Sequence, residues 1–100
     1  GLQADLKTFT ALGVYGTSIV TALTAQNTVG VTGVMAVPPD FIGAQFRAVT
    51  SDMQIAAAKT GMLGDTATVL SVAELIKASG LAPVVVDPVM VATSGDVLLQ

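Results

Sequence analysis

The sequence predicts an α/β protein with three layers, α/β/α, in which helices cover a mainly parallel β-sheet. Segments with strand character and helix character alternate along residues 31–87, and this alternation is typical of parallel sheets with right-handed crossovers. The run VVVD at residues 84–87 is the second indication, because continuous valines are typical of a strand buried on both faces.

One helix and two strands are predicted first. Apolar residues recur at helical spacing in residues 2–12, and Gly13 follows as a candidate C-cap. Residues 15–26 are rich in Thr, Ile and Val and predict a strand. After a turn at residues 27–30, residues 31–37 predict a second strand. This turn is far too short for a parallel crossover, so the second strand should turn back or join a different layer.

A helix is predicted next, because Pro38 and Pro39 stop a strand and proline is common in the first turn of a helix. Its predicted apolar face consists of Ile42, Phe46, Val49 and Met53, with Phe41 alongside. Residues 56–63 predict a short buried strand. Asp65 is the candidate N-cap of a further helix, and Gly80 is its expected end. The apolar period of that helix is formed by Val69, Ala73 and Ile76.

The carboxyl ends of the predicted strands are the expected place for a ligand, because ligands of open α/β sheets bind there. These ends lie at residues 26–28, 61–62 and 87–89. We expect the three ends to converge on one pocket.

The composition excludes several classes of function. The net charge is −3 and the basic residues are few and widely spread, so the chain has no basic patch for nucleic acid. With no Cys and no His, it has no disulfide, no ordinary zinc site and no imidazole base. Any metal would be a hard ion such as Mg²⁺. Because only 11% of residues are charged, we expect the chain to be one part of a larger domain that covers its apolar surface.

Residues 8–39 contain no charged side chain, and a stretch of that length could cross a bilayer. Glycines, threonines, Gln26 and Asn27 interrupt it, and its β-branched content favours strands. We therefore expect no membrane span. No signal peptide is visible, and the expected location is the cytoplasm.

The candidate site residues are Asp5, Gln26, Met62 and Asp87. Asp87 either caps its strand in solvent or holds Mg²⁺ beside phosphates, and Pro88 restrains it to an extended backbone. Gln26 has an acceptor and donors that suit the edge of a heterocycle, although amides are also common in turns. Met62 is either a wall for an aromatic ring or gap-filling core. Asp5 either faces solvent or accepts hydrogen bonds from a ligand.

Three segments together resemble one known family. They are GLQADLKTFTALGVYGTSIVTALTAQNT at residues 1–28, KTGML at residues 59–63 and VVVDPVMVATSGDVLL at residues 84–99. In order and without visible gaps, they are similar to the hydroxymethylpyrimidine/phosphomethylpyrimidine kinases of thiamine biosynthesis, which belong to the ribokinase-like superfamily. The resemblance implies that residues 1–100 are the N-terminal part of a single ribokinase-like kinase domain without its C-terminal half.

The resemblance also implies an activity and a site. The activity is ATP-dependent phosphorylation of hydroxymethylpyrimidine and then of its monophosphate. Matching positions place Asp5, Gln26, Met62 and Val89 around the pyrimidine, and Asp87 near Mg²⁺ and the triphosphate of ATP. The glycine-rich anion hole of the family and its catalytic base lie outside this sequence. We therefore expect no catalytic residue in this stretch and no activity of the chain by itself.

Two other functions stay open. A pyridoxal or pyridoxine kinase of the same superfamily would also bind a small aromatic heterocycle that bears a hydroxymethyl group. A non-catalytic pyrimidine-binding module is the third possibility. The expected partners are the pyrimidine and ATP, and the low charge content leaves room for a homodimer interface in the whole protein.

Overall fold

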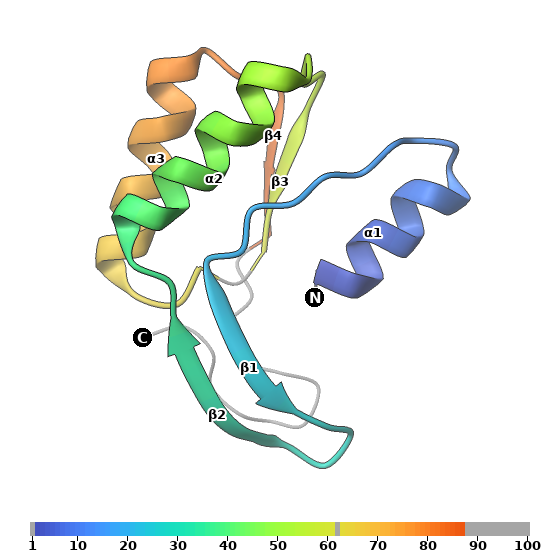
Figure 1. Ribbon diagram of the computed structural model, residues 1–100. Coiled ribbons are helices and arrows are strands. Elements are labelled where there is room, and N and C mark those ends of the chain that lie inside the picture. The colour runs from blue at the N-terminus through green and yellow to red at the C-terminus, as the bar shows by residue number, and fades with distance from the viewer. Residues whose placement is uncertain (1, 62, 88–100) are drawn as a thin grey trace.

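The structure is a computed structural model, and it describes residues 2–61 and 63–87. Its elements are α1 (Leu2–Ala11), β1 (Ala22–Gln26), β2 (Val31–Ala36), α2 (Pro39–Asp52), β3 (Ala58–Thr60), α3 (Thr66–Ser79) and β4 (Val84–Val86). Helices α2 and α3 pack together on one side of β3 and β4, and α1 lies on the other side (Figure 1). This order of helix, sheet and helix agrees with the predicted layers.

The strands β1 and β2 form an antiparallel pair, as the short turn between them predicted. Asn27 closes that turn, because its Oδ1 accepts hydrogen bonds from the backbone N–H groups of Val29 at 2.8 Å and Gly30 at 3.1 Å. Asparagine favours turns through such bonds to its own backbone. The strand is shorter than residues 15–26 predicted, because β2 pairs only with Ala22–Gln26.

The strands β3 and β4 are parallel, and α3 connects them, which is the predicted crossover unit. Lys59 pairs with Val85 in this register. The described strands nevertheless form two separate two-stranded sheets instead of one. The tight turn after β1 explains the antiparallel pairing of β1 with β2, and no described strand joins this pair to β3 and β4.

Helix α2 begins at Pro39, as predicted. Ile42 is 1% exposed and is the one fully buried large apolar side chain of the described residues. The other half-buried members of the predicted face are Phe46, Val49 and Met53. Phe41, which was expected alongside this face, is 60% exposed, because neighbouring residues of a helix are rotated by about 100° from each other.

Helix α3 has both predicted ends. The Oδ1 of Asp65 accepts a hydrogen bond from the backbone N–H of Thr68 at 2.8 Å, and Gly80 has the left-handed φ of 70° that a C-cap requires. The predicted burial of Ala73 is wrong, since Ala73 is exposed. Val69 and Ile76 of the predicted period are half-buried, and the inner face continues through Thr68 and Val72, because positions three and four residues apart share one face of a helix.

The valine run of β4 is less buried than its composition predicted. Val85 and Val86 are 62% and 69% exposed, because β3 is the only described strand that pairs with β4. Leu12, Tyr15 and Met35 are exposed as well. The exposed apolar surface agrees with the expectation that more protein covers this chain.

The uncharged stretch of residues 8–39 does not form one long helix. It contains the end of α1, an irregular segment and the β1–β2 hairpin. Helix α1 ends at Ala11, and Gly13 adopts a φ of 77°, as expected for a residue that stops a helix. Within residues 2–61 and 63–87, every helix is too short or too polar to span a bilayer.

Candidate functional site

Lys59, in the middle of β3, lies between two carboxylates that come from different elements. Its Nζ donates a hydrogen bond to Oδ2 of Asp5 at 2.7 Å and lies 3.6 Å from Oδ2 of Asp87. Asp5 belongs to the first turn of α1, and Asp87 directly follows β4. Two of the predicted site residues are therefore brought together, and a lysine joins them.

The pairing of β3 with β4 places Lys59 and Asp87 on the same face of the sheet. Lys59 is opposite Val85, and Asp87 is two residues further along the chain than Val85. Since successive side chains of an extended strand point to opposite faces, Val85 and Asp87 share the face of Lys59. The backbone N–H of Asp87 donates to the carbonyl of Thr60 at 3.1 Å, so the pairing continues to this residue.

Two glycines let the chain return along α1 after the helix ends. Gly13 has a φ of 77°, which reverses the chain direction at little steric cost. A Cβ atom at residue 16 would lie 2.8 Å from Cδ2 of Phe9 and 2.9 Å from Cδ2 of Leu6, so Gly16 permits close packing against the helix. This packing helps to set the position of α1, and with it the position of Asp5.

The cluster of Asp5, Lys59 and Asp87 is partly open to water. The exposed fractions of the side chains are 30% for Asp5, 23% for Lys59 and 52% for Asp87. The hydrogen bond to Asp5 raises the pKa of Lys59 above its ordinary value of 10.5; partial burial opposes this shift, and the charges of Asp5 and Asp87 add to it. Lys59 is therefore a stable cation at neutral pH that faces two carboxylates.

Gln26 lies in the other sheet. It is the last residue of β1, next to a β-bulge, and it pairs with Val31 of β2. Its Oε1 accepts a hydrogen bond from Oγ1 of Thr24 at 3.4 Å. Figure 1 shows the β1–β2 hairpin extending away from α2 and α3. The strand ends at Thr60 and Asp87 are neighbours. The end of β1 belongs to a different sheet, and among the described elements β1 does not contact β3 or β4.

Met62 and Val89 lie outside the described residues. Lys59, in contrast, was not among the predicted site residues. The sequence feature that could have identified Lys59 is that it is the only charged residue in the predicted strand at residues 56–63. A lone charge within an apolar strand requires a partner or water.

The acidic residues of the cluster fit Mg²⁺ only in part. Among residues 2–61 and 63–87, no three Asp, Glu, His or Cys side chains are grouped closely enough to hold a metal ion. Mg²⁺ is nevertheless often held by one or two carboxylates together with substrate phosphates, and Asp87 is exposed enough to be one such ligand. The described residues therefore fit a Mg²⁺ site to which a nucleotide adds ligands, and they do not form a complete site among themselves.

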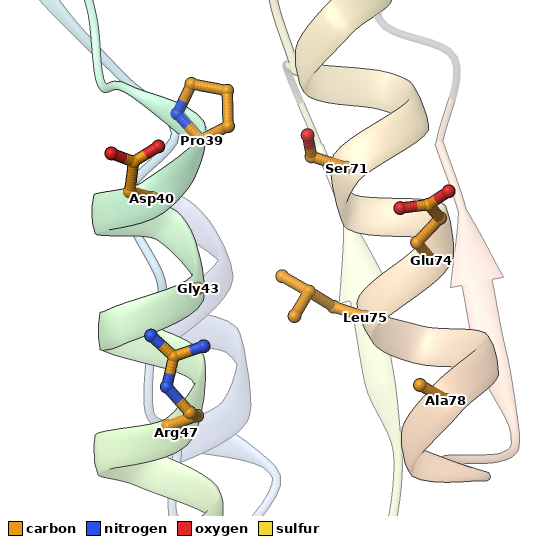
Figure 2. Close-up of a pocket in the computed structure, with 8 residues that line it drawn as sticks. All are labelled: Pro39, Asp40, Gly43, Arg47, Ser71, Glu74, Leu75 and Ala78. Carbon is orange, nitrogen blue, oxygen red and sulfur yellow. The ribbon is translucent and has the colours of Figure 1, made fainter.

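A groove with a volume of about 580 Å³ lies between α2 and α3. Its lining residues are Pro39, Asp40, Gly43, Arg47, Ser71, Glu74, Leu75 and Ala78. Figure 2 shows the carboxylates of Asp40 and Glu74 and the guanidinium of Arg47 around it. Among the described residues, Asp5, Gln26, Lys59 and Asp87 do not line this groove, so it is distinct from the Lys59 cluster.

Comparison with known proteins finds the same family by sequence in a family model and in individual relatives. The family model for phosphomethylpyrimidine kinase matches residues 1–100. The hydroxymethylpyrimidine/phosphomethylpyrimidine kinase of Rhizobium meliloti is 54% identical over 100 residues, which are 100% of this chain and 37% of that protein. The chain thus spans little more than a third of the length of this relative.

Two solved structures have a similar fold. The phosphomethylpyrimidine kinase from Clostridium difficile matches with a TM-score of 0.90 and 45% identity, over 100% of this chain and 43% of that chain. The pyridoxal kinase from Staphylococcus aureus, in complex with AMP-PCP and pyridoxal, matches with a TM-score of 0.77 and 36% identity, over 94% of this chain and 35% of that chain. The predicted fold class, a partial ribokinase-like α/β fold, is confirmed, and the match along its whole length shows that the chain belongs to the phosphomethylpyrimidine kinase family.

Proposed function

We propose that the protein to which this chain belongs is a kinase of thiamine biosynthesis, which uses ATP to phosphorylate hydroxymethylpyrimidine and then its monophosphate. The observation that carries the proposal is the meeting of Asp5 and Asp87 at the ends of α1 and β4, in a chain that belongs to this family. The chain contributes part of one kinase domain. By itself we expect it to be inactive.

The pyrimidine is proposed to lie against Asp5, Gln26, Met62 and Val89. A pyrimidine with an exocyclic amine presents a donor beside a ring acceptor, and the amide of Gln26 can pair with both. Asp5 supplies a carboxylate that accepts hydrogen bonds. Met62 and Val89 would cover the faces of the ring with apolar surface.

The phosphates are proposed to lie near Asp87. Phosphoryl transfer depends mainly on positioning and on stabilisation of negative charge. Mg²⁺, when bound with the nucleotide, supplies positive charge at the phosphate oxygens, and Asp87 would be its carboxylate ligand. The AMP-PCP in the pyridoxal kinase complex supports the use of ATP.

Pyridoxal is the second candidate substrate, and the likeness to the pyridoxal kinase complex favours it specifically. The experiment that separates the two is a competition assay with the full-length protein, ATP, hydroxymethylpyrimidine and pyridoxal. We expect phosphorylated pyrimidine as the main product. Preferential phosphorylation of pyridoxal would refute the proposed substrate, and binding of the pyrimidine without phosphorylation would indicate a non-catalytic binding module.

Gln26→Ala tests the pyrimidine site directly. Loss of two hydrogen bonds should weaken binding of hydroxymethylpyrimidine to the full-length protein by about tenfold, whereas the affinity for ATP should change little. Gln54→Ala is the matched control, because Gln54 is also exposed and lies just after α2. An unchanged pyrimidine affinity in titration calorimetry would remove Gln26 from the site.

We also propose that the whole protein is a homodimer and works in the cytoplasm. The exposed apolar side chains of this chain, among them Leu12, Tyr15 and Met35, support an interface of some kind, because large apolar patches commonly mark contact surfaces. Sedimentation equilibrium of the full-length protein measures the oligomeric state, and a monomer would contradict the dimer.

A further inference from the structure

The two contacts of Lys59 are unequal. The ammonium group makes a charge-assisted hydrogen bond with Asp5 at 2.7 Å, a length typical of strong bonds of this type. The contact between Nζ of Lys59 and Oδ2 of Asp87, at 3.6 Å, is an ion pair without a short hydrogen bond. Asp87 is also the more exposed of the two acids, with 52% of its side chain accessible against 30% for Asp5. Asp5 is therefore held, and Asp87 is available to a further partner.

Stability of the fold is a poor explanation for Lys59. Ion pairs that stay partly in water contribute little to the free energy of unfolding, because solvent screens the charges and long side chains lose entropy. The pairing of β3 with β4 uses backbone hydrogen bonds, which an uncharged side chain at residue 59 would leave intact. The clearer effect of the lysine is on the direction of the Asp5 carboxylate.

Building on the proposed function, we propose that Lys59 is a positioning residue of the pyrimidine site, because it holds the Asp5 carboxylate in one orientation and leaves Asp87 open to a second ligand. A carboxylate that is already fixed loses less side-chain freedom when a ligand binds, so affinity increases. Lys59 also offsets one of two neighbouring negative charges, which reduces the repulsion that an anionic ligand would meet near them.

The test is titration calorimetry of the full-length protein with hydroxymethylpyrimidine in the absence of nucleotide. Lys59→Met should weaken binding about tenfold, because Asp5 loses its fixed partner. Lys59→Arg should restore most of the affinity, since a guanidinium also pairs with carboxylates. Lys7→Met is the matched control, because Lys7 is an exposed lysine of α1, two residues from Asp5. The affinity of the Lys7→Met variant for hydroxymethylpyrimidine should stay unchanged.

A double-mutant cycle shows whether Lys59 acts through Asp5. Asp5→Asn should weaken binding, and the addition of Lys59→Met should weaken it no further. The melting temperature of Lys59→Met should fall by less than roughly 3 °C. These results together would support the positioning role.

Three outcomes would overturn it. The first is a Lys59→Met variant that binds the pyrimidine as tightly as the unchanged protein does. The second is a full additional loss of affinity in the double variant, which would mean that Lys59 acts independently of Asp5. The third is a wild-type protein that does not bind the pyrimidine at all, and this result alone would also refute the proposed function.

Discussion

The side-chain amide of Gln45 forms two hydrogen bonds with the backbone of Val20. The N–H of Val20 donates to Oε1 at 2.8 Å, and Nε2 donates to the carbonyl of Val20 at 2.9 Å. Val20 belongs to the irregular segment between α1 and β1, where no neighbouring strand is described for it. The amide therefore takes the place of a strand partner and fastens this segment to α2.

Replacement of Gln45 should destabilise the protein. Gln45→Ala leaves the partly buried N–H and carbonyl of Val20 without this partner, which should lower the free energy of unfolding by about 1–3 kcal/mol. Urea denaturation of the full-length protein measures the change. Gln54→Ala removes an exposed amide and should change stability by less than about 0.5 kcal/mol. Equal losses in the two variants would contradict a structural role for the Gln45 amide.

Gly16→Ala should disturb the packing of α1. The added methyl group would lie 2.8 Å from Phe9 and 2.9 Å from Leu6, so these side chains must move, at an expected cost of about 1–3 kcal/mol. Gly33→Ala is the control, because the nearest atom to its added methyl is at 3.6 Å, an ordinary contact distance. If thermal unfolding showed the same small effect for both, the close approach at Gly16 would not constrain α1.

Asp65 should stabilise α3 through its side-chain cap. The backbone N–H of Thr68 lowers the pKa of Asp65 below its ordinary value of 3.8, so the cap contributes fully above that pH and is lost as the pH falls through the lowered pKa. Asp65→Ala should reduce the melting temperature of the full-length protein by roughly 2–4 °C at neutral pH, and Asp65→Asn by less, because asparagine is an equally good N-cap. As the pH is lowered, the difference in melting temperature between the unchanged protein and Asp65→Ala should become smaller. A difference that stays constant would argue against the cap.

The Lys59 ion pairs should weaken in strong alkali. Because the pKa of Lys59 is raised above 10.5 in the folded protein, the stability that its charge contributes is present below 10.5 and is lost as the pH rises through the raised pKa. The difference in unfolding free energy between lysine and methionine at residue 59 is at most about 1 kcal/mol. It should therefore vanish only when the pH exceeds the raised pKa of Lys59 in the folded protein. Lys59→Arg should show no such loss, since a guanidinium stays charged; a loss at lower pH would contradict the pairing.

Features that depend on a few neighbouring residues were predictable. Asp65 and Gly80 are the N-cap and C-cap of α3, α2 begins at Pro39, and Asn27 forms the turn before β2. Each of these follows from the hydrogen bonds or the backbone angles of one residue type. Strand lengths were less predictable, because a strand extends only as far as its partner does.

Asp5 and Asp87 were both expected in the site, but Asp5 was expected at the pyrimidine and Asp87 near Mg²⁺ and the phosphates, so no contact between them was predicted. Lys59, which connects them, was missed because its hydrogen bond to Asp5 joins residues 54 positions apart. No local period or motif contains such a contact. The described strands do not bring Gln26 into contact with this cluster, because β1 lies in its own sheet with β2. That Gln26 and Asp5 bind the same pyrimidine stays a prediction.

Residue order alone settles the alternation of helices and strands, the helix ends and the presence of carboxylates at the tips of the chain's elements, because these depend on local backbone preferences. Folding in three dimensions decides which of those carboxylates share a cation, through the parallel pairing of β3 with β4 and the packing of α1. Those contacts join distant residues, and their free energy is a property of the assembled fold.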